Sequence, residues 1–321
     1  GEYEARIAAA RLPAGEMPPG VPAAYQQAVA AGWEAGLRLI QRLAANARYF
    51  TDSASKVVLD VGAGNAAAGL CIDFYGRFEA DVSNGGRPDG AMAYATPRGG
   101  SAVSADPISL LRGAPHRETA RRFIEFVLGE EGQKLWCYRV GTPGGPQKYA
   151  LQRFPIRRDF YPSDNPRFQK AYERHRRFTT DDLGGPTVDM YRLAHEFVYR
   201  PRWTSGYFGL FRDLIRAMCM DAGQELRAAW REILAAGGPE RCPRAMEILG
   251  RLPQAPEPLT WASGLAMGRK YDRLDLLREW TVQYRRQYAE AARLARMEGG
   301  PDSPTGQARG GLNPVAGEAR P

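Results

Sequence analysis

The sequence has no long apolar run and no recognisable metal-binding motif. No stretch approaches the ~18 consecutive apolar residues that a membrane-spanning helix needs. No C-x-x-C pair occurs among the four cysteines, which are Cys71, Cys137, Cys219 and Cys242. Partners at metal-ligand spacing are also missing for the three histidines, His116, His175 and His195. We therefore expect no zinc site and interpret the histidines as structural or solvated. A disulfide among the cysteines stays open.

What the chain does have is the composition of an ordinary globular protein. Of its 321 residues, 44% are hydrophobic and 25% are charged, which suits one large domain or two ordinary ones. The net charge is +8 and the pI is about 9.4. Such an excess can attract nucleic acid or an acidic surface, but here it is moderate and spread along the chain. Charge alone therefore assigns no partner.

Hydrophobic spacing in residues 1–150 predicts a mixture of helices and strands. An amphipathic helix is expected over residues 23–45 and a second helical region within residues 115–136. Two short strands are expected over residues 69–76 and 91–97. The mixture predicts an α/β fold for this part of the chain.

The rest of the chain has a different character. Residues 151–298 start with a basic, aromatic linker and continue with helical patterns over residues 207–220, 224–236, 243–249 and 274–297. Residues 299–321 are rich in glycine and proline, with little to bury, so we expect a disordered tail.

A glycine pair, Gly62 and Gly64, raises the question of a nucleotide-cofactor enzyme. It follows the apolar run "KVVLDV", as in the first loop of many methyltransferases. Such a loop needs a third small residue and then a long helix that receives the ligand. Here Gly69 comes next, and the sequence becomes strand-like directly after it. We interpret the pair as punctuation between a helix and a strand, with a methyltransferase-like enzyme as the alternative.

Longer segments resemble one protein family. Residues 37–78 contain a Ser-rich helix start and then the pattern "V-x-x-G-x-A-A-x-G". Residues 96–136 continue with an Asp-Pro pair, the turn "GAPH" and the helical run "FIEFVLGEEGQKLW". Together with "GTPGGP", "PIRRDFY" and "EFVYRPRWT", these segments resemble extracellular solute-binding proteins of ABC transporters, in the group similar to ferric-ion-binding proteins.

The resemblance implies a fold, a function and a location. It implies that residues 1–150 form the second lobe of a type-2 periplasmic-binding-protein fold, with a mainly helical extension after it. The implied function is that of a non-enzymatic, monomeric receptor, periplasmic or extracellular, which captures a small solute between two lobes and delivers it to a membrane permease. The family's first lobe has no counterpart here, so we expect the chain to be an N-terminally incomplete copy. No cofactor is implied, and ferric iron would be transported cargo.

The resemblance also points to ligand-binding residues. Where the ferric branch has two adjacent tyrosines, this chain has Asp73, Phe74 and Tyr75. Tyrosinate and carboxylate oxygens suit Fe(III), and on a strand Asp73 and Tyr75 would share one face. Because Phe74 cannot ligate, iron is weakened as the ligand and an organic or anionic solute is a serious rival. A structural role, with Tyr75 packing at the strand end and Asp73 capping a turn, also stays open.

Three further polar residues are candidates for the same site. Ser53 and Ser55 lie at a predicted helix start, where hydroxyls and backbone N–H groups favour an anion, although simple N-capping accounts for them too. Asp106 lies before Pro107 on the segment that crosses between lobes in the resembled family. It either faces the cleft or forms a hydrogen bond within the hinge.

A different class of function is suggested by residues 153–178. Eight Arg and Lys residues alternate there with aromatic residues, among them Phe154, Phe160, Tyr161, Phe168 and Tyr172. Single-strand nucleic-acid binders combine cations with stacking rings in this way. Acidic residues interrupt the pattern, and arginines often only cover a surface. Nucleic-acid binding is therefore the alternative function, whereas the preferred function, solute binding, implies no nucleic-acid partner.

Overall fold

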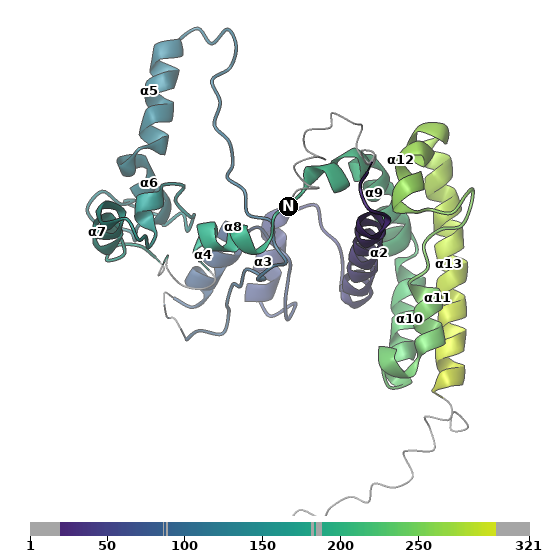
Figure 1. Ribbon diagram of the computed structural model, residues 1–321. Helices are drawn as coiled ribbons and strands as arrows, with labels where there is room; N and C mark the ends of the chain where they lie inside the picture. Colours follow the sequence, from purple (N-terminus) through teal and green to yellow (C-terminus); the bar gives the residue numbers. More distant parts are fainter. Residues whose placement is uncertain (1–19, 86, 88, 181–182, 184–187, 300–321) are drawn as a thin grey trace, which may run out of the picture. The chain divides into compact units, whose positions relative to one another are not determined.

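The computed structural model describes residues 20–85, 87, 89–180, 183 and 188–299 (Figure 1). The chain forms two compact units. One unit contains residues 20–50 together with residues 200–299, and the other contains residues 51–199, as far as they are described. We call them the helical bundle and the inserted unit.

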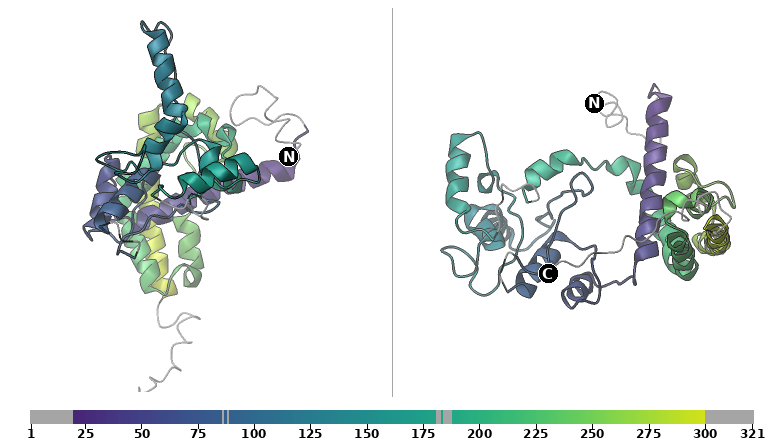
Figure 2. Two further views of the ribbon diagram at one scale, coloured as in Figure 1. Left: turned by 90° about the vertical axis from the view of Figure 1, so that its left-hand side faces the viewer. Right: turned by 90° about the horizontal axis from the view of Figure 1, so that it is seen from below.

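The helical bundle joins one early helix to the C-terminal helices. Its main elements are α2 (Ala23–Asn46), α9 (Phe208–Ile215), the π-helical turn η4 (Arg216–Asp221), α10 (Gly223–Ala235), α11 (Pro243–Leu249), α12 (Trp261–Lys270) and α13 (Arg273–Glu298). Short 3₁₀ turns are η2 (Pro201–Trp203), η3 (Ser205–Tyr207) and η5 (Pro239–Arg241). α2 packs on α10 and α12, and the right-hand view in Figure 2 shows it, in purple, beside the green helices of the bundle.

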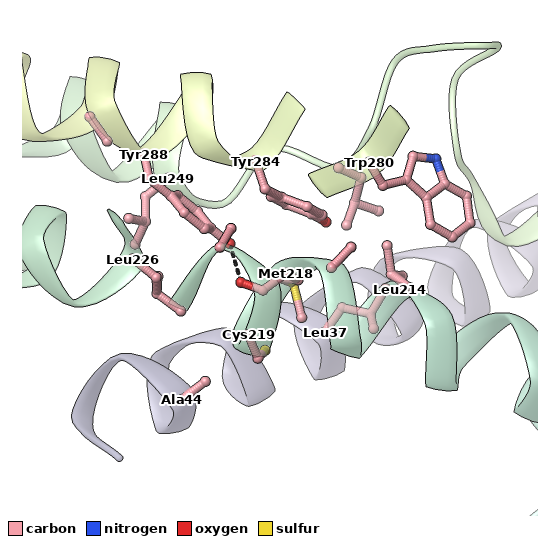
Figure 3. Packing of buried hydrophobic residues seen from close by; sticks show 14 of the residues in the cluster. Leu37, Ala44, Leu214, Met218, Cys219, Leu226, Leu249, Trp280, Tyr284 and Tyr288 are labelled. Carbon is pink, nitrogen blue, oxygen red and sulfur yellow. Dashed lines mark hydrogen bonds between the residues drawn. The ribbon is translucent and has the colours of Figure 1, made fainter. Parts of the chain in front are cut away.

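The long helix α13 supplies the centre of the bundle core. It begins at Asp272, whose side chain accepts hydrogen bonds from the N–H groups of Leu274 and Asp275. Three aromatic residues follow at intervals of four residues and therefore share one face of the helix: Trp280, Tyr284 and Tyr288. Each is at most 1% exposed. Figure 3 shows this face packed against side chains of η4, α9 and α2.

A buried polar contact ties α2 into this core. Gln41 of α2 donates from Nε2 to the Tyr288 hydroxyl and to the carbonyl of Leu249, both at 2.8 Å. Tyr288 in turn donates to the carbonyl of Met218 at 3.0 Å (Figure 3). Buried hydrogen bonds therefore join α2, η4, α11 and α13.

The inserted unit is also helical. Its elements are α3 (Ala54–Gly62), α4 (Asp73–Ser83), α5 (Arg117–Leu128), α6 (Glu130–Cys137), η1 (Arg158–Phe160), α7 (Pro166–His175) and α8 (Met190–Glu196). Its small core consists of Cys137, Tyr138, Phe160, Tyr161 and Leu183. Asn165 caps α7 by accepting from the N–H of Arg167, and proline at the first helical position fits that start.

The predicted α/β fold is wrong. The described residues contain helices and no sheet, and their isolated β-bridge joins Tyr138 to Thr179. The type-2 second lobe implied by the resemblance is therefore not formed. The expected strand over residues 69–76 turns into α4 at Asp73, and residues 91–97 have no regular structure. Short apolar runs do not distinguish a strand from a packed helix by their spacing, which explains the error.

Most of the predicted helices are present in the structure. The helix over residues 23–45 is α2, and the helices expected near residues 224–236, 243–249 and 274–297 are α10, α11 and α13. The helix expected within residues 115–136 is two helices, α5 and α6, separated at Gly129. Apart from Gly299, the tail predicted to be disordered lies outside the described residues.

Candidate functional site

A polar cavity of about 190 Å³ lies against α4 in the inserted unit. Its lining residues come from α4, from the C-cap Asn84 and from segments outside the helices: Arg77, Ala80, Asp81, Asn84, Tyr94, Gln152, Thr180 and Val188. We call it the α4 cavity. Most of these residues are polar, so the cavity suits a ligand that forms hydrogen bonds.

One face of α4 forms the helical wall of this cavity. Arg77, Ala80, Asp81 and Asn84 are spaced three or four residues apart and therefore share a face. Asp73 is one turn before Arg77 and continues the same face. The face thus presents carboxylate, guanidinium and carboxylate in turn.

Arg77 is a buried cation on this wall. It is 7% exposed, and its guanidinium lies over the Phe154 ring, 3.7 Å from the centroid. Burial lowers the pKa of Arg77 to about 10, and the nearby Asp73 carboxylate opposes that shift. Arg77 therefore stays charged at neutral pH. A charged group in such a place attracts an anion strongly, because little water screens it.

Gln152 lines the cavity beside Asp81 and has an unusual backbone conformation. Its φ is 55°, and no other non-glycine residue in the described part of the chain has a positive φ. It is 5% exposed and donates from Nε2 to Oδ2 of Asp81 at 3.2 Å. Such a conformation costs about 1–3 kcal/mol and occurs most often at binding and catalytic sites. The strain therefore marks this wall as a functional candidate.

Tyr94 completes the wall because α4 has a glycine beside it. A Cβ at Gly76 would lie 2.5 Å from Cδ2 of Tyr94, so only glycine lets the ring pack this closely. The Tyr94 hydroxyl accepts from Oγ1 of Thr96 at 3.1 Å. Burial raises the pKa of Tyr94, so the phenol stays neutral and can donate to a ligand.

The two residues predicted to share a strand face do not do so. Asp73 and Tyr75 lie in the first turn of α4, where residues two apart point in nearly opposite directions. Asp73 is on the face of the α4 cavity. Tyr75 instead lies against Phe74, with ring centroids 4.4 Å apart. The structure therefore separates the proposed iron ligands.

None of the predicted site residues is among the lining residues of the cavity, although Asp73 lies one turn before Arg77 on α4. Asp106 has a side chain that is 91% exposed, and it is 3.5 Å from Nη1 of Arg153, whose guanidinium covers Phe74. Ser53 and Ser55 are at the start of α3 with hydroxyls 3.3 Å apart, and Ser53 makes no side-chain cap hydrogen bond. Their binding role stays a prediction.

The glycine pair does not form a cofactor loop. Gly62 is the last residue of α3, and Gly64 follows in the left-handed region with φ of 73°. The apolar run before them is helical, so the strand–loop–helix context of a nucleotide site is not formed. The prediction that the glycines end a helix is confirmed, although the next regular element is the helix α4 and not a strand.

The basic stretch over residues 153–178 is largely folded into the inserted unit. Phe160, Tyr161 and Tyr172 are at most 5% exposed and cannot stack on bases. Arg157 pairs with Asp159 and Arg174 with Glu130. Rings and several of the cations thus have structural roles.

A second cavity, about 270 Å³, lies in the helical bundle. It is bordered by glycines of α9 and α12 and by Arg273, whose Nε is 2.7 Å from Oδ2 of Asp213. Asp213 pairs with Arg273, and Arg269 is the other charged residue of the lining. This cavity lacks a strained residue such as Gln152 and a buried cation such as Arg77, so we regard the α4 cavity as the better candidate.

Comparison with known proteins adds a likeness to one class. Residues 7–137 match the family model described as bacterial extracellular solute-binding protein. No curated protein and no solved structure matched the chain. The match covers less than half of the chain, ends with α6 and includes every α4 residue of the cavity. Solute-binding proteins are typically not enzymes and generally work with an ABC permease. No described helix combines the length and apolarity needed to cross a membrane.

Sequence reasoning missed Arg77, Asp81 and Gln152. If residues 73–83 are assigned to a helix, Arg77 and Asp81 lie four and eight residues after Asp73 and therefore on the same helix face as Asp73. Gln152 has no local signal, because nothing in its neighbours dictates a positive φ.

Proposed function

We propose that the chain is the solute-capturing component of an ABC importer and that the α4 cavity holds the solute. The observation that carries this proposal is the placement of Arg77 and Asp81 on one face of a cavity within the family-matched residues. In this proposal the protein binds its solute outside the cytoplasmic membrane, catalyses no reaction and transfers the solute to a membrane permease.

The cavity defines a class of solute. A volume of about 190 Å³ is below the roughly 300–1,000 Å³ of sites for drug-sized ligands. Arg77 suits a carboxylate or another anionic group, while Asp81 suits an ammonium or hydroxyl group. We therefore propose a small zwitterionic solute of about amino-acid size. Iron is not favoured, because Tyr75 and Asp73 face different directions.

Calorimetry on the full chain tests this function. The panel contains amino acids, small sugars, polyamines, inorganic phosphate and Fe(III)-citrate. We expect saturable binding of a zwitterion, weakened about 10- to 100-fold by Arg77→Met and by Asp81→Asn, since each removes a charged hydrogen bond. Glu79→Gln, on α4 but outside the lining, is the matched control and should bind normally.

Two results would contradict the proposal. If no solute of the panel binds to the folded chain, the α4 cavity is not a solute site. If a solute binds equally well to the Arg77→Met and Asp81→Asn variants, it binds elsewhere. A visible charge-transfer band with Fe(III)-citrate, lost in Tyr75→Phe, would instead restore iron as the cargo.

A further inference from the structure

A fully buried histidine faces two carboxylates in the inserted unit. His175 is the last residue of α7 and is 0% exposed. Glu130 is the first residue of α6, and Asp159 lies in η1. One ligand-type atom from each of the three lies within 4.8 Å of the other two. None of these residues lines the α4 cavity.

The imidazole atom that points to the carboxylates lacks a hydrogen bond. Nε2 of His175 has no hydrogen-bond partner among the residues that the structure describes, whereas buried polar atoms almost always have one. It lies 3.8 Å from Oε1 of Glu130, too far for a hydrogen bond. Two atoms that each lie about 2.1 Å from a tetrahedral Zn²⁺ are about 3.4 Å apart. The spacing therefore fits two ligands of one cation after a small contraction.

The other side of the imidazole is fixed. Nδ1 of His175 is 2.6 Å from the Tyr138 hydroxyl, and the Phe160 ring stacks on the imidazole with centroids 3.9 Å apart. Metal-binding histidines usually donate their second N–H to such an outer partner. With Nδ1 donating to Tyr138, Nε2 presents its lone pair to Glu130 and Asp159.

Side-chain cations already contact both carboxylates. Lys134 and Arg174 each lie 3.1 Å from Oε1 of Glu130, and Arg157 binds both oxygens of Asp159. The Arg174 side chain is 59% exposed, and such ion pairs contribute little stability. Arg174 can therefore move into solvent when a metal ion takes its place at Glu130, and Lys134 keeps a second carboxylate partner, Glu131, at 2.6 Å.

We propose that Glu130, Asp159 and His175 bind one Zn²⁺ or a similar divalent first-row transition-metal ion. An imidazole with two carboxylates is a donor set that such ions accept. The ion would tie α6, η1 and α7 together, so its role is to stabilise the inserted unit. This site is independent of the solute that the α4 cavity takes.

Metal titration of the full chain tests the proposal. The chain is prepared without a histidine tag and treated with a chelator, then titrated with Zn²⁺ by calorimetry and with Co²⁺ by visible absorption. We expect one ion per chain, Co²⁺ bands in the visible region and a higher thermal midpoint with Zn²⁺. Glu130→Gln, Asp159→Asn and His175→Gln should each weaken binding by more than about 100-fold, beyond the usual effect of losing an outer partner.

Matched variants show whether the effect is local. Glu131→Gln changes the neighbouring, more exposed carboxylate, and Cys137→Ala removes a buried thiol of the same core; both should bind normally. Absence of saturable binding to the wild-type chain would overturn the proposal. So would unchanged affinity in Glu130→Gln, whose side chain is one-third exposed and whose fold should survive. Binding lost only in His116→Gln or His195→Gln would place the ion elsewhere.

Discussion

Replacing Gln152 separates the contribution of its side chain from the cost of its backbone. At a φ of 55°, a residue with a Cβ is disfavoured by roughly 1–2 kcal/mol. Glycine avoids that cost but loses about 0.5–1 kcal/mol through its greater freedom in the unfolded chain. Gln152→Gly and Gln152→Ala both lose the hydrogen bond to Asp81, so that term cancels. We expect the glycine variant to be more stable than the alanine variant by about 0.5–1 kcal/mol.

The adjacent Leu151 provides the control, because its φ is not positive. There the order should reverse, with Leu151→Ala more stable than Leu151→Gly by about 0.5–1 kcal/mol. Hydrogen exchange of peptides from residues 51–199 measures both pairs, since a chain of two units need not unfold in one transition. If Gln152→Ala equals or exceeds Gln152→Gly in stability, the backbone is not strained and the argument fails.

Two further substitutions test the packing. Tyr288→Phe should destabilise the helical bundle by about 1–3 kcal/mol, because the Met218 carbonyl and Gln41 lose a buried partner. Hydrogen exchange of peptides from residues 200–299 measures the change, and a loss below about 0.5 kcal/mol would show that both groups find other partners. Gly76→Ala should displace the Tyr94 ring from the α4 cavity and weaken solute binding by at least about tenfold, the equivalent of 1.4 kcal/mol; unchanged binding in calorimetry would show that the ring is not part of the site.

Long periodic helices could be predicted from the sequence, and interrupted ones could not. In α13 the apolar residues repeat at helical spacing and Asp272 marks the start. α12 was missed because Gly264 and Gly268 lower its helical propensity; its capping box at Thr260 and its packing on α9 overcome that cost. Tertiary contacts thus determine that a helix forms where the local helical propensity is weak.

The candidate site was predictable only in part. Asp73 was proposed through a resemblance; it lies in the first turn of α4, one turn before Arg77 and outside the cavity lining, and its binding role stays a prediction. The predicted strand placed Tyr75 on the same face as Asp73, because side chains on one strand face repeat every two residues. In the helix that forms, one face repeats every three or four residues, so Arg77 shares the face of Asp73 instead. The sequence gives His175 no partner at metal-ligand spacing, because Glu130 and Asp159 are distant along the chain and only folding brings them near it.

The pairing of α2 with the C-terminal helices has a consequence for how the chain is made. Roughly 150 residues separate α2 from the first helix of the bundle that follows the inserted unit, and synthesis at about 5–20 residues per second takes on the order of ten seconds to supply them. During that time the apolar side of α2, with Trp33 and Leu37, has no partner from its own bundle. The inserted unit is complete first, so a nascent chain should present one folded unit and one exposed helix to chaperones and proteases. Pulse proteolysis of stalled chains should therefore cut within residues 23–46 until α13 has emerged.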